Sequence, residues 1–103
     1  MVVTVFRARL KPEAAEEYQQ WAGRMSKLAS AMPGYVSHKI FLAADGERVT
    51  IVEFDSEEHH RAWSMHPDHV QAKMKGRADF YSEYRIQVCQ VLRQSEFPSE
   101  AAR

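Results

Sequence analysis

The alternation of apolar and polar residues predicts a strand followed by a long helix in the first third of the chain. Residues 2–10 are rich in Val, Thr and Phe and predict a strand, which Lys11 and Pro12 end as a helix begins. From residue 14 onward, large apolar side chains recur every three or four positions, a spacing typical of one helical face. These side chains are Tyr18, Trp21, Met25, Leu28 and Met32. Pro33 and Gly34 end this helix.

Two further strands are predicted over residues 35–43 and 48–55, with a hairpin turn between them that contains Asp45 and Gly46. An Asp-Gly pair supplies the positive φ angles that tight hairpin turns require. The turn residues therefore join these two strands as antiparallel neighbours.

A second helical region begins in the sequence Asp-Ser-Glu-Glu at residues 55–58. Asp55 can cap this helix, and Glu58 can return the capping bond three residues later. Pro67 interrupts the helical pattern and Gly76 ends it, so we expect the region to be bent or in two pieces.

A last strand is predicted within residues 81–93, which completes the order β-α-β-β-α-β. This order indicates an α+β, ferredoxin-like fold, an antiparallel sheet with two helices on one face. Residues 1–93 then form one domain, and residues 94–103 are polar and are predicted to form a C-terminal tail.

Both faces of the predicted sheet are apolar. The face expected to meet the helices carries Phe6, Ala8, Leu10, Val36, Ile40, Leu42, Val52, Phe54, Ile86, Val88 and Leu92. The opposite face carries Val3, Val5, Tyr35, Phe41, Val49, Ile51, Cys89 and Val91 among Arg7, Lys39, Glu53 and Arg85. Since both helices are used on the first face, we expect the second to be covered by another copy of the chain, giving a homodimer.

Composition narrows the classes of partner. The chain has 103 residues and equal numbers of basic and acidic residues, 14 of each, which gives no electrostatic case for a nucleic-acid or membrane surface. No apolar stretch approaches the roughly 20 residues that span a bilayer. Arg7 and Arg9 precede any signal-like apolar run, and Cys89 has no cysteine partner. We therefore expect a cytoplasmic protein.

Several motifs resemble the antibiotic biosynthesis monooxygenase family, whose members are small dimeric α+β barrels with this element order. The motifs are Phe6-Arg7, Pro33-Gly34, Val-Glu-Phe-Asp-Ser-Glu-Glu at 52–58, Ala62-Trp63, His66-Pro67-Asp68-His69, and Phe80-Tyr81-x-x-Tyr84-x-Ile86-x-Val88. The segment Trp-x-x-His-Pro is the most specific of them. The resemblance covers approximately residues 2–92 and implies the dimeric α+β barrel.

The resemblance also implies a function. One branch oxidises a small phenol, anthrone or quinol with oxygen and without flavin, haem or metal, in a pocket that contains a Trp, and Trp63 matches it. His66 or His69 would act as the base, because His exchanges protons near neutral pH. Phe80, Tyr81 and Tyr84 would line the aromatic pocket. Arg7 would steer a phenolate or carboxylate, and its alternative is an ion pair across the sheet or the dimer.

Two other functions stay open. Every residue named above can also be explained by packing, so the chain could be a noncatalytic dimer that binds a small ligand or an accessory partner of an enzyme. A haem-binding or haem-degrading protein is disfavoured. That branch has a His ten residues after the Trp and an Asn on the first strand, whereas this chain has Lys73 and no Asn in residues 6–9.

Neither a metal site nor a bound cofactor is predicted. His59 and His60 are adjacent and so diverge around a helix, which leaves too few convergent ligands for zinc or iron. We expect both at the surface or in capping roles, and Lys73 and Arg77 to be solvated. The glycines stand singly, so no phosphate-binding loop supports a nucleotide or flavin.

Overall fold

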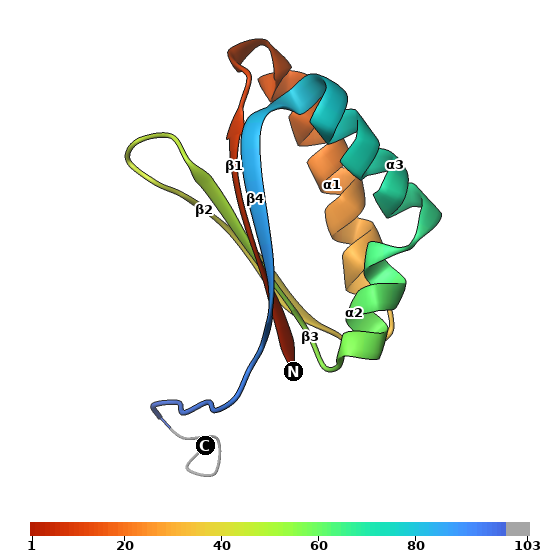
Figure 1. The fold of residues 1–103 in the computed structure, drawn as a ribbon, viewed down its shortest axis with the longest axis vertical. Helices are drawn as coiled ribbons and strands as arrows, with labels where there is room; N and C mark the ends of the chain where they lie inside the picture. The colour runs from red at the N-terminus through yellow and green to blue at the C-terminus, as the bar shows by residue number, and fades with distance from the viewer. Residues whose placement is uncertain (99–103) are drawn as a thin grey trace.

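The computed structural model of the chain describes residues 1–98 (Figure 1). Its elements in order are β1 (Val2–Leu10), the 3-10 turn η1 (Pro12–Ala14), α1 (Ala15–Ala31), β2 (Tyr35–Leu42), β3 (Arg48–Phe54), α2 (Glu57–Ser64), α3 (Pro67–Lys75), the π-helical segment η2 (Gly76–Phe80) and β4 (Tyr81–Gln90). Residues 94–98 of the predicted tail contain no helix or strand, and its residues 99–103 lie outside the described residues.

The four strands form one antiparallel sheet in the order β2-β3-β1-β4. The helices α1, α2 and α3 all lie on one face of it, and the other face carries no helix of the described chain (Figure 1). The predicted α+β, ferredoxin-like fold is confirmed. Within residues 1–98 no helix is long and apolar enough to cross a membrane.

Glycine geometry fixes the two turns around β2. Gly34 has a φ of +82°, and a Cβ there would collide with the side chains of Asp55 and His59. In the hairpin only Gly46 has a positive φ, at +93°, so the expectation that Asp45 shares this geometry is wrong. Asp45 instead accepts a hydrogen bond from the backbone N–H of Glu47 at 3.1 Å, which stabilises a longer loop.

The second helical region is in two pieces, as predicted, but its caps differ. Ser56 rather than Asp55 caps α2, because its hydroxyl accepts from the N–H of His59 at 3.2 Å, while Asp55 pairs with the His59 ring. Gly76 does not end the region, since the chain continues helically through η2. Its lack of a side chain is still needed, because a Cβ would lie 2.6 Å from the ring of Tyr81.

A β-bulge changes which residues of β2 face the helices. The register with β3 shifts between Tyr35 and Ser37, so Tyr35 turns toward the helices and Val36 is left 45% exposed. The predicted orientations of these two residues are therefore wrong. Leu92, also expected to meet the helices, lies beyond the end of β4 and is exposed.

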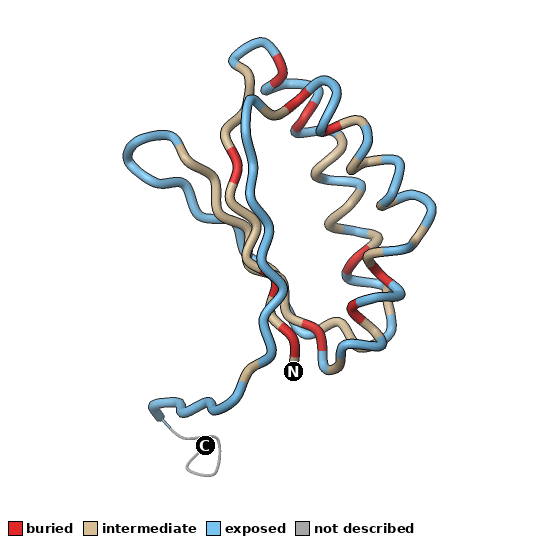
Figure 2. The backbone as a smooth tube through the Cα atoms, in the orientation of Figure 1, coloured by how far each residue is buried: buried red, intermediate tan, exposed pale blue. Residues whose placement is uncertain are grey.

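The helices contact the sheet through two separate apolar clusters. One contains Ala14, Tyr18 and Phe80 and lies where η1, α1 and η2 meet. The other contains Ala29, Phe54 and Trp63 and lies near the far end of α1, against β3 and α2. The buried segments in Figure 2 accordingly gather at the two ends of the helical layer, and the space between the clusters is a cavity.

Candidate functional site

The cavity between sheet and helices has a volume of about 460 Å³. Its walls come from the helix-facing residues of all four strands and from α1, α2, α3 and η2. This volume lies within the range of small-molecule binding sites, which are clefts lined mostly by apolar groups with a few polar ones. The chemistry of the cavity therefore depends on those few polar side chains.

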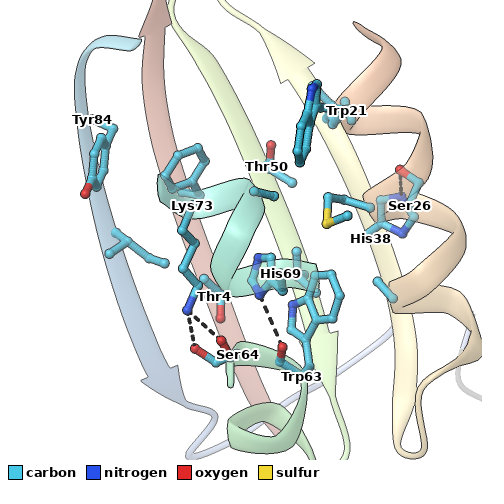
Figure 3. A pocket seen from close by; sticks show the side chains of 18 of the residues that line it. Thr4, Trp21, Ser26, His38, Thr50, Trp63, Ser64, His69, Lys73 and Tyr84 are labelled. Carbon is cyan, nitrogen blue, oxygen red and sulfur yellow. Dashed lines mark hydrogen bonds between the residues drawn. The ribbon is translucent and has the colours of Figure 1, made fainter. Parts of the chain in front are cut away.

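Trp63 and His69 lie side by side in this wall (Figure 3). Trp63 is buried because it lies on the sheet-facing side of α2. The chain changes direction at Pro67, where α3 begins, and this places the ring of His69 over the indole. The two rings stack with centroids 3.8 Å apart and an interplanar angle of 13°. Trp63 also stacks against Phe54, which is fully buried, with ring centroids 6.5 Å apart.

The hydrogen bond of His69 fixes its tautomer. Its Nδ1 lies 3.2 Å from the backbone carbonyl oxygen of Trp63. A carbonyl oxygen only accepts, so Nδ1 carries the proton and donates, which leaves the lone pair of the neutral ring on Nε2. Burial, and next the charge of Lys73, lower the pKa of His69 to about 4. The ring is therefore neutral at neutral pH and can accept a proton at Nε2.

Two other histidines line the cavity in hydrogen-bonded pairs that sequence reasoning missed. His60 Nε2 lies 2.7 Å from the hydroxyl of Thr4 on β1. This ring is 8% exposed, so the expectation of a surface role is wrong, and burial lowers its pKa. His38 on β2 lies between the hydroxyl of Tyr35 at 2.6 Å and that of Ser26 at 3.1 Å.

The sequence did contain a signal for these pairs. Thr4 has the same strand parity as Phe6 and Ala8, and His38 has that of Ile40, so both belong to the helix-facing set by alternation alone. His60 lies three residues before Trp63, which places the two on one helical face.

Lys73 also lines the cavity, so the expectation that it is solvated is wrong. Its ammonium donates to the carbonyl oxygen of Ser64 at 2.7 Å and to the Ser64 hydroxyl at 2.8 Å. Burial, and then the nearby charge of Arg77, lower its pKa. Arg77 is exposed at the edge of the cavity, where its Nε donates to the hydroxyl of Tyr84 at 2.9 Å.

The aromatic residues near β4 line the cavity at its other end. Phe80 and Tyr81 pack edge-to-face around Tyr18, with ring centroids 6.0 Å from it in both cases. Burial raises the pKa of Tyr81, so its phenol stays protonated. Tyr84 lies 5.6 Å from the ring of Phe6 and keeps 38% of its surface exposed.

Two predicted site residues lie away from this cavity. His66 is the N-cap of α3, where its Nδ1 accepts from the N–H of Asp68 at 3.1 Å. Arg7 lies on the opposite face of the sheet and pairs with Glu47 through two hydrogen bonds of 2.9 and 3.2 Å. The structure thus brings Trp63, His69, Phe80, Tyr81 and Tyr84 together and leaves His66 and Arg7 outside.

Within residues 1–98, no three His, Cys, Asp or Glu side chains converge in a way that could hold a metal ion. The histidines of the cavity are each held by a hydroxyl or a backbone carbonyl instead. Lys73, ten residues after Trp63, carries an ammonium, which has no lone pair to offer a metal ion.

Comparisons with known proteins are consistent with this architecture. The family model described as antibiotic biosynthesis monooxygenase matches residues 1–75. A protein of Bacillus subtilis (strain 168), described as uncharacterized protein YqjZ, is 34% identical over 93 residues, which cover 90% of this chain and 82% of that protein.

Solved structures share the fold at low sequence identity. Rv0793 from Mycobacterium tuberculosis superposes with a TM-score of 0.81 at 18% identity, over 92% of this chain and 98% of that one. SnoaB from Streptomyces nogalater, described as a cofactor-independent oxygenase, superposes with a TM-score of 0.77 at 19% identity, over 95% and 97% of the two chains. These likenesses establish the fold.

Proposed function

Because the chain belongs to the antibiotic biosynthesis monooxygenase family, we propose that it is a monooxygenase that oxidises a small phenol, anthrone or quinol with molecular oxygen. The cavity beside Trp63 is the proposed site. The description of SnoaB as a cofactor-independent oxygenase supports a reaction in which the substrate itself supplies the electrons. Phe80, Tyr81 and Tyr84 form the aromatic walls that hold the ring.

The observation that carries this proposal is the fixed tautomer of His69. With its Nδ1 proton engaged by the carbonyl of Trp63, Nε2 is the atom that accepts the acidic proton of the bound substrate. A ring whose pKa is about 4 is a weak base, so it suits a substrate whose anion is stabilised by delocalisation over its own rings, as in an anthrone or a quinol.

The redox step then balances without an added reductant. The substrate anion transfers one electron to oxygen, and recombination forms a carbon–oxygen bond as a hydroperoxide. Loss of water breaks the oxygen–oxygen bond and leaves a carbonyl on the ring. One oxygen atom stays in the product, the other leaves as water with two substrate hydrogens, and the substrate supplies all four electrons. Trp63 and Phe80, which are both buried, shield this intermediate from water on their side of the cavity.

We also propose that the working form is a homodimer, in which the helix-free face of the sheet packs against the same face of a second copy. Val3, Val5, Val49 and Ile51 gather on that face among charged residues. A dimer of this kind leaves one cavity in each copy, between its own sheet and helices.

Oxygen consumption with a panel of anthrones, phenols and hydroquinones tests the reaction. His69→Asn should lower the rate with the best substrate by about 100- to 10,000-fold, the usual contribution of a general base. Trp63→Phe should lower the rate less, since the smaller phenyl ring still forms part of the apolar wall. Mass spectrometry with labelled oxygen should find one labelled atom in the product.

His66→Asn is the matched control, because it makes the same substitution three residues earlier and Asn still caps a helix. Its rate should equal that of the unchanged protein. Equal rates for the unchanged protein and His69→Asn would rule out the assigned base. Ligand binding without oxygen consumption across the panel would instead favour a noncatalytic binding protein.

A further inference from the structure

Two cations line one side of the cavity, and within residues 1–98 no Asp or Glu lines it with them. Lys73 on α3 and Arg77 on η2 are four positions apart, which places them on one side of the same helical run. The chain as a whole has a formal net charge of zero. The lining of the cavity is therefore positively charged, although the chain as a whole is neutral.

Lys75, two residues after Lys73, shows the arrangement that a surface lysine adopts. Its ammonium lies 2.8 Å from the carboxylate of Glu17 and 2.6 Å from that of Asp79. Lys73 instead points into the cavity and donates to two uncharged oxygens of Ser64. An ammonium has three N–H donors, so one of them stays available for a ligand.

Arg77 has donors to spare in the same way. Its Nε donates to Tyr84, and no ion pair joins Arg77 or Lys73 to a carboxylate among the described residues. The guanidinium has five N–H donors, and its fork matches the two oxygens of a carboxylate. Because Lys73 is partly buried, it has lost water without gaining a counter-ion, which is an unfavourable state for a charge.

We propose that the ligand of this cavity is an aromatic carboxylate, whose carboxylate binds Lys73 and Arg77 while its ring lies against Trp63 and His69. The part of this assignment that concerns the reacting ring rests on the proposed function. The carboxylate provides the counter-ion that the cavity lacks, and charge-assisted hydrogen bonds to both cations fix the ring beside Nε2 of His69. The volume of about 460 Å³ accommodates a substrate of two or three fused rings.

The test compares 6-hydroxy-2-naphthoate with its methyl ester, which lacks the negative charge and carries one additional methyl group. Binding is measured under argon by quenching of tryptophan fluorescence, since both Trp21 and Trp63 line the cavity. We expect the acid to bind at least tenfold more tightly than the ester. Lys73→Gln should reduce this preference to nearly one, Arg77→Gln should reduce it in part, and Lys73→Arg should keep it.

Lys27→Gln, which removes the charge of an exposed lysine on α1, is the matched control and should leave the preference unchanged. Equal affinities of acid and ester for the unchanged protein would overturn the proposal, as would a preference that survives Lys73→Gln together with Arg77→Gln. Because binding under argon needs no turnover, an acid preference in a protein that consumes no oxygen would reject the proposed reaction and retain this ligand class. Oxygen uptake together with equal affinities for the acid and the ester would support the proposed reaction and reject this ligand class.

Discussion

The two faces of the sheet differ in how completely the helices of a single chain cover them, and neighbouring residues of β3 show the difference. Phe54 and Val52 face the helices and belong to the cluster around Trp63, with Phe54 fully buried. Ile51 and Val49 face the other way, where the described chain places no helix, and both are only half-buried. Strand alternation supplies apolar side chains to both faces, but helices cover one.

Even the covered face is incomplete along one edge. Ile86 and Val88 on β4 line the cavity, yet each keeps 52% of its surface exposed, and Figure 2 shows β4 exposed along its length. The buried apolar contacts between the helices and the sheet are concentrated in the two clusters that flank the cavity. One face therefore buries side chains to hold the fold and a ligand site, and the other stays available for association.

The largest expected effect comes from placing a charge on the helix-free face. Ile51→Asp puts a carboxylate at the centre of the proposed dimer contact, and the two-fold axis places a second one there. Burying a carboxylate costs several kcal/mol, which the ammonium of its cross-strand neighbour Lys39 offsets only in part, so the dimer should dissociate while the monomer keeps its helical circular dichroism. Analytical ultracentrifugation measures this directly.

Val70→Asp is the matched control for that substitution. Val70 lies on α3, on the other side of the sheet, and is 37% exposed. The variant should sediment like the unchanged protein. If Ile51→Asp also keeps the unchanged sedimentation coefficient of a dimer, the helix-free face is not the contact.

The next largest effect tests the covered face. Phe54→Ala removes a side chain with no exposed surface, which packs against Trp63 and Tyr35. We expect the free energy of unfolding to fall by about 3–5 kcal/mol, the range for large-to-small aromatic substitutions in cores. Urea unfolding followed by tryptophan fluorescence measures it. A loss below about 1 kcal/mol would mean that this face is not the main source of stability.

Periodicity predicted the fold well because alternation and helical spacing report directly on burial. It identified the order of strands and helices along the chain and a second helical region that is bent or in two pieces. It misplaced Tyr35 and Val36 because a bulge inserts one residue and reverses the alternation from there. The sequence suggests Asp55 as the cap because Asp and Ser both suit that position, whereas in the structure Ser56 is the cap and Asp55 pairs with the ring of His59 four residues later.

The site was harder to predict because its polar residues act through partners on other elements. The local sequence predicts a surface position for His60, because its hydrogen-bond partner Thr4 lies 56 positions away in the chain. Lys73 was expected in solvent, as most lysines are. What turns it inward is the end of α2, where Ser64 presents two acceptors, and the change of direction at Pro67 that brings α3 over them.

The smallest expected effect concerns His69, on the covered face, and how the free energy of unfolding depends on pH below neutrality. The pKa of His69 is about 4 in the folded chain, against an ordinary value of 6.5, mainly because of burial. Between these values the unfolded chain binds a proton that the folded chain does not, so the free energy of unfolding falls as pH falls from 6.5 to 4. At about 1.4 kcal/mol per pKa unit, His69 accounts for at most about 3 kcal/mol of that loss. His69→Asn removes the titrating ring, so its stability should fall less steeply over this window, as measured by urea unfolding at several pH values.

Carboxylates with lowered pKa values, such as Asp45 and Asp79, act alike in both proteins and cancel in the difference. Parallel curves for the two proteins would show that the ring is not held neutral by burial.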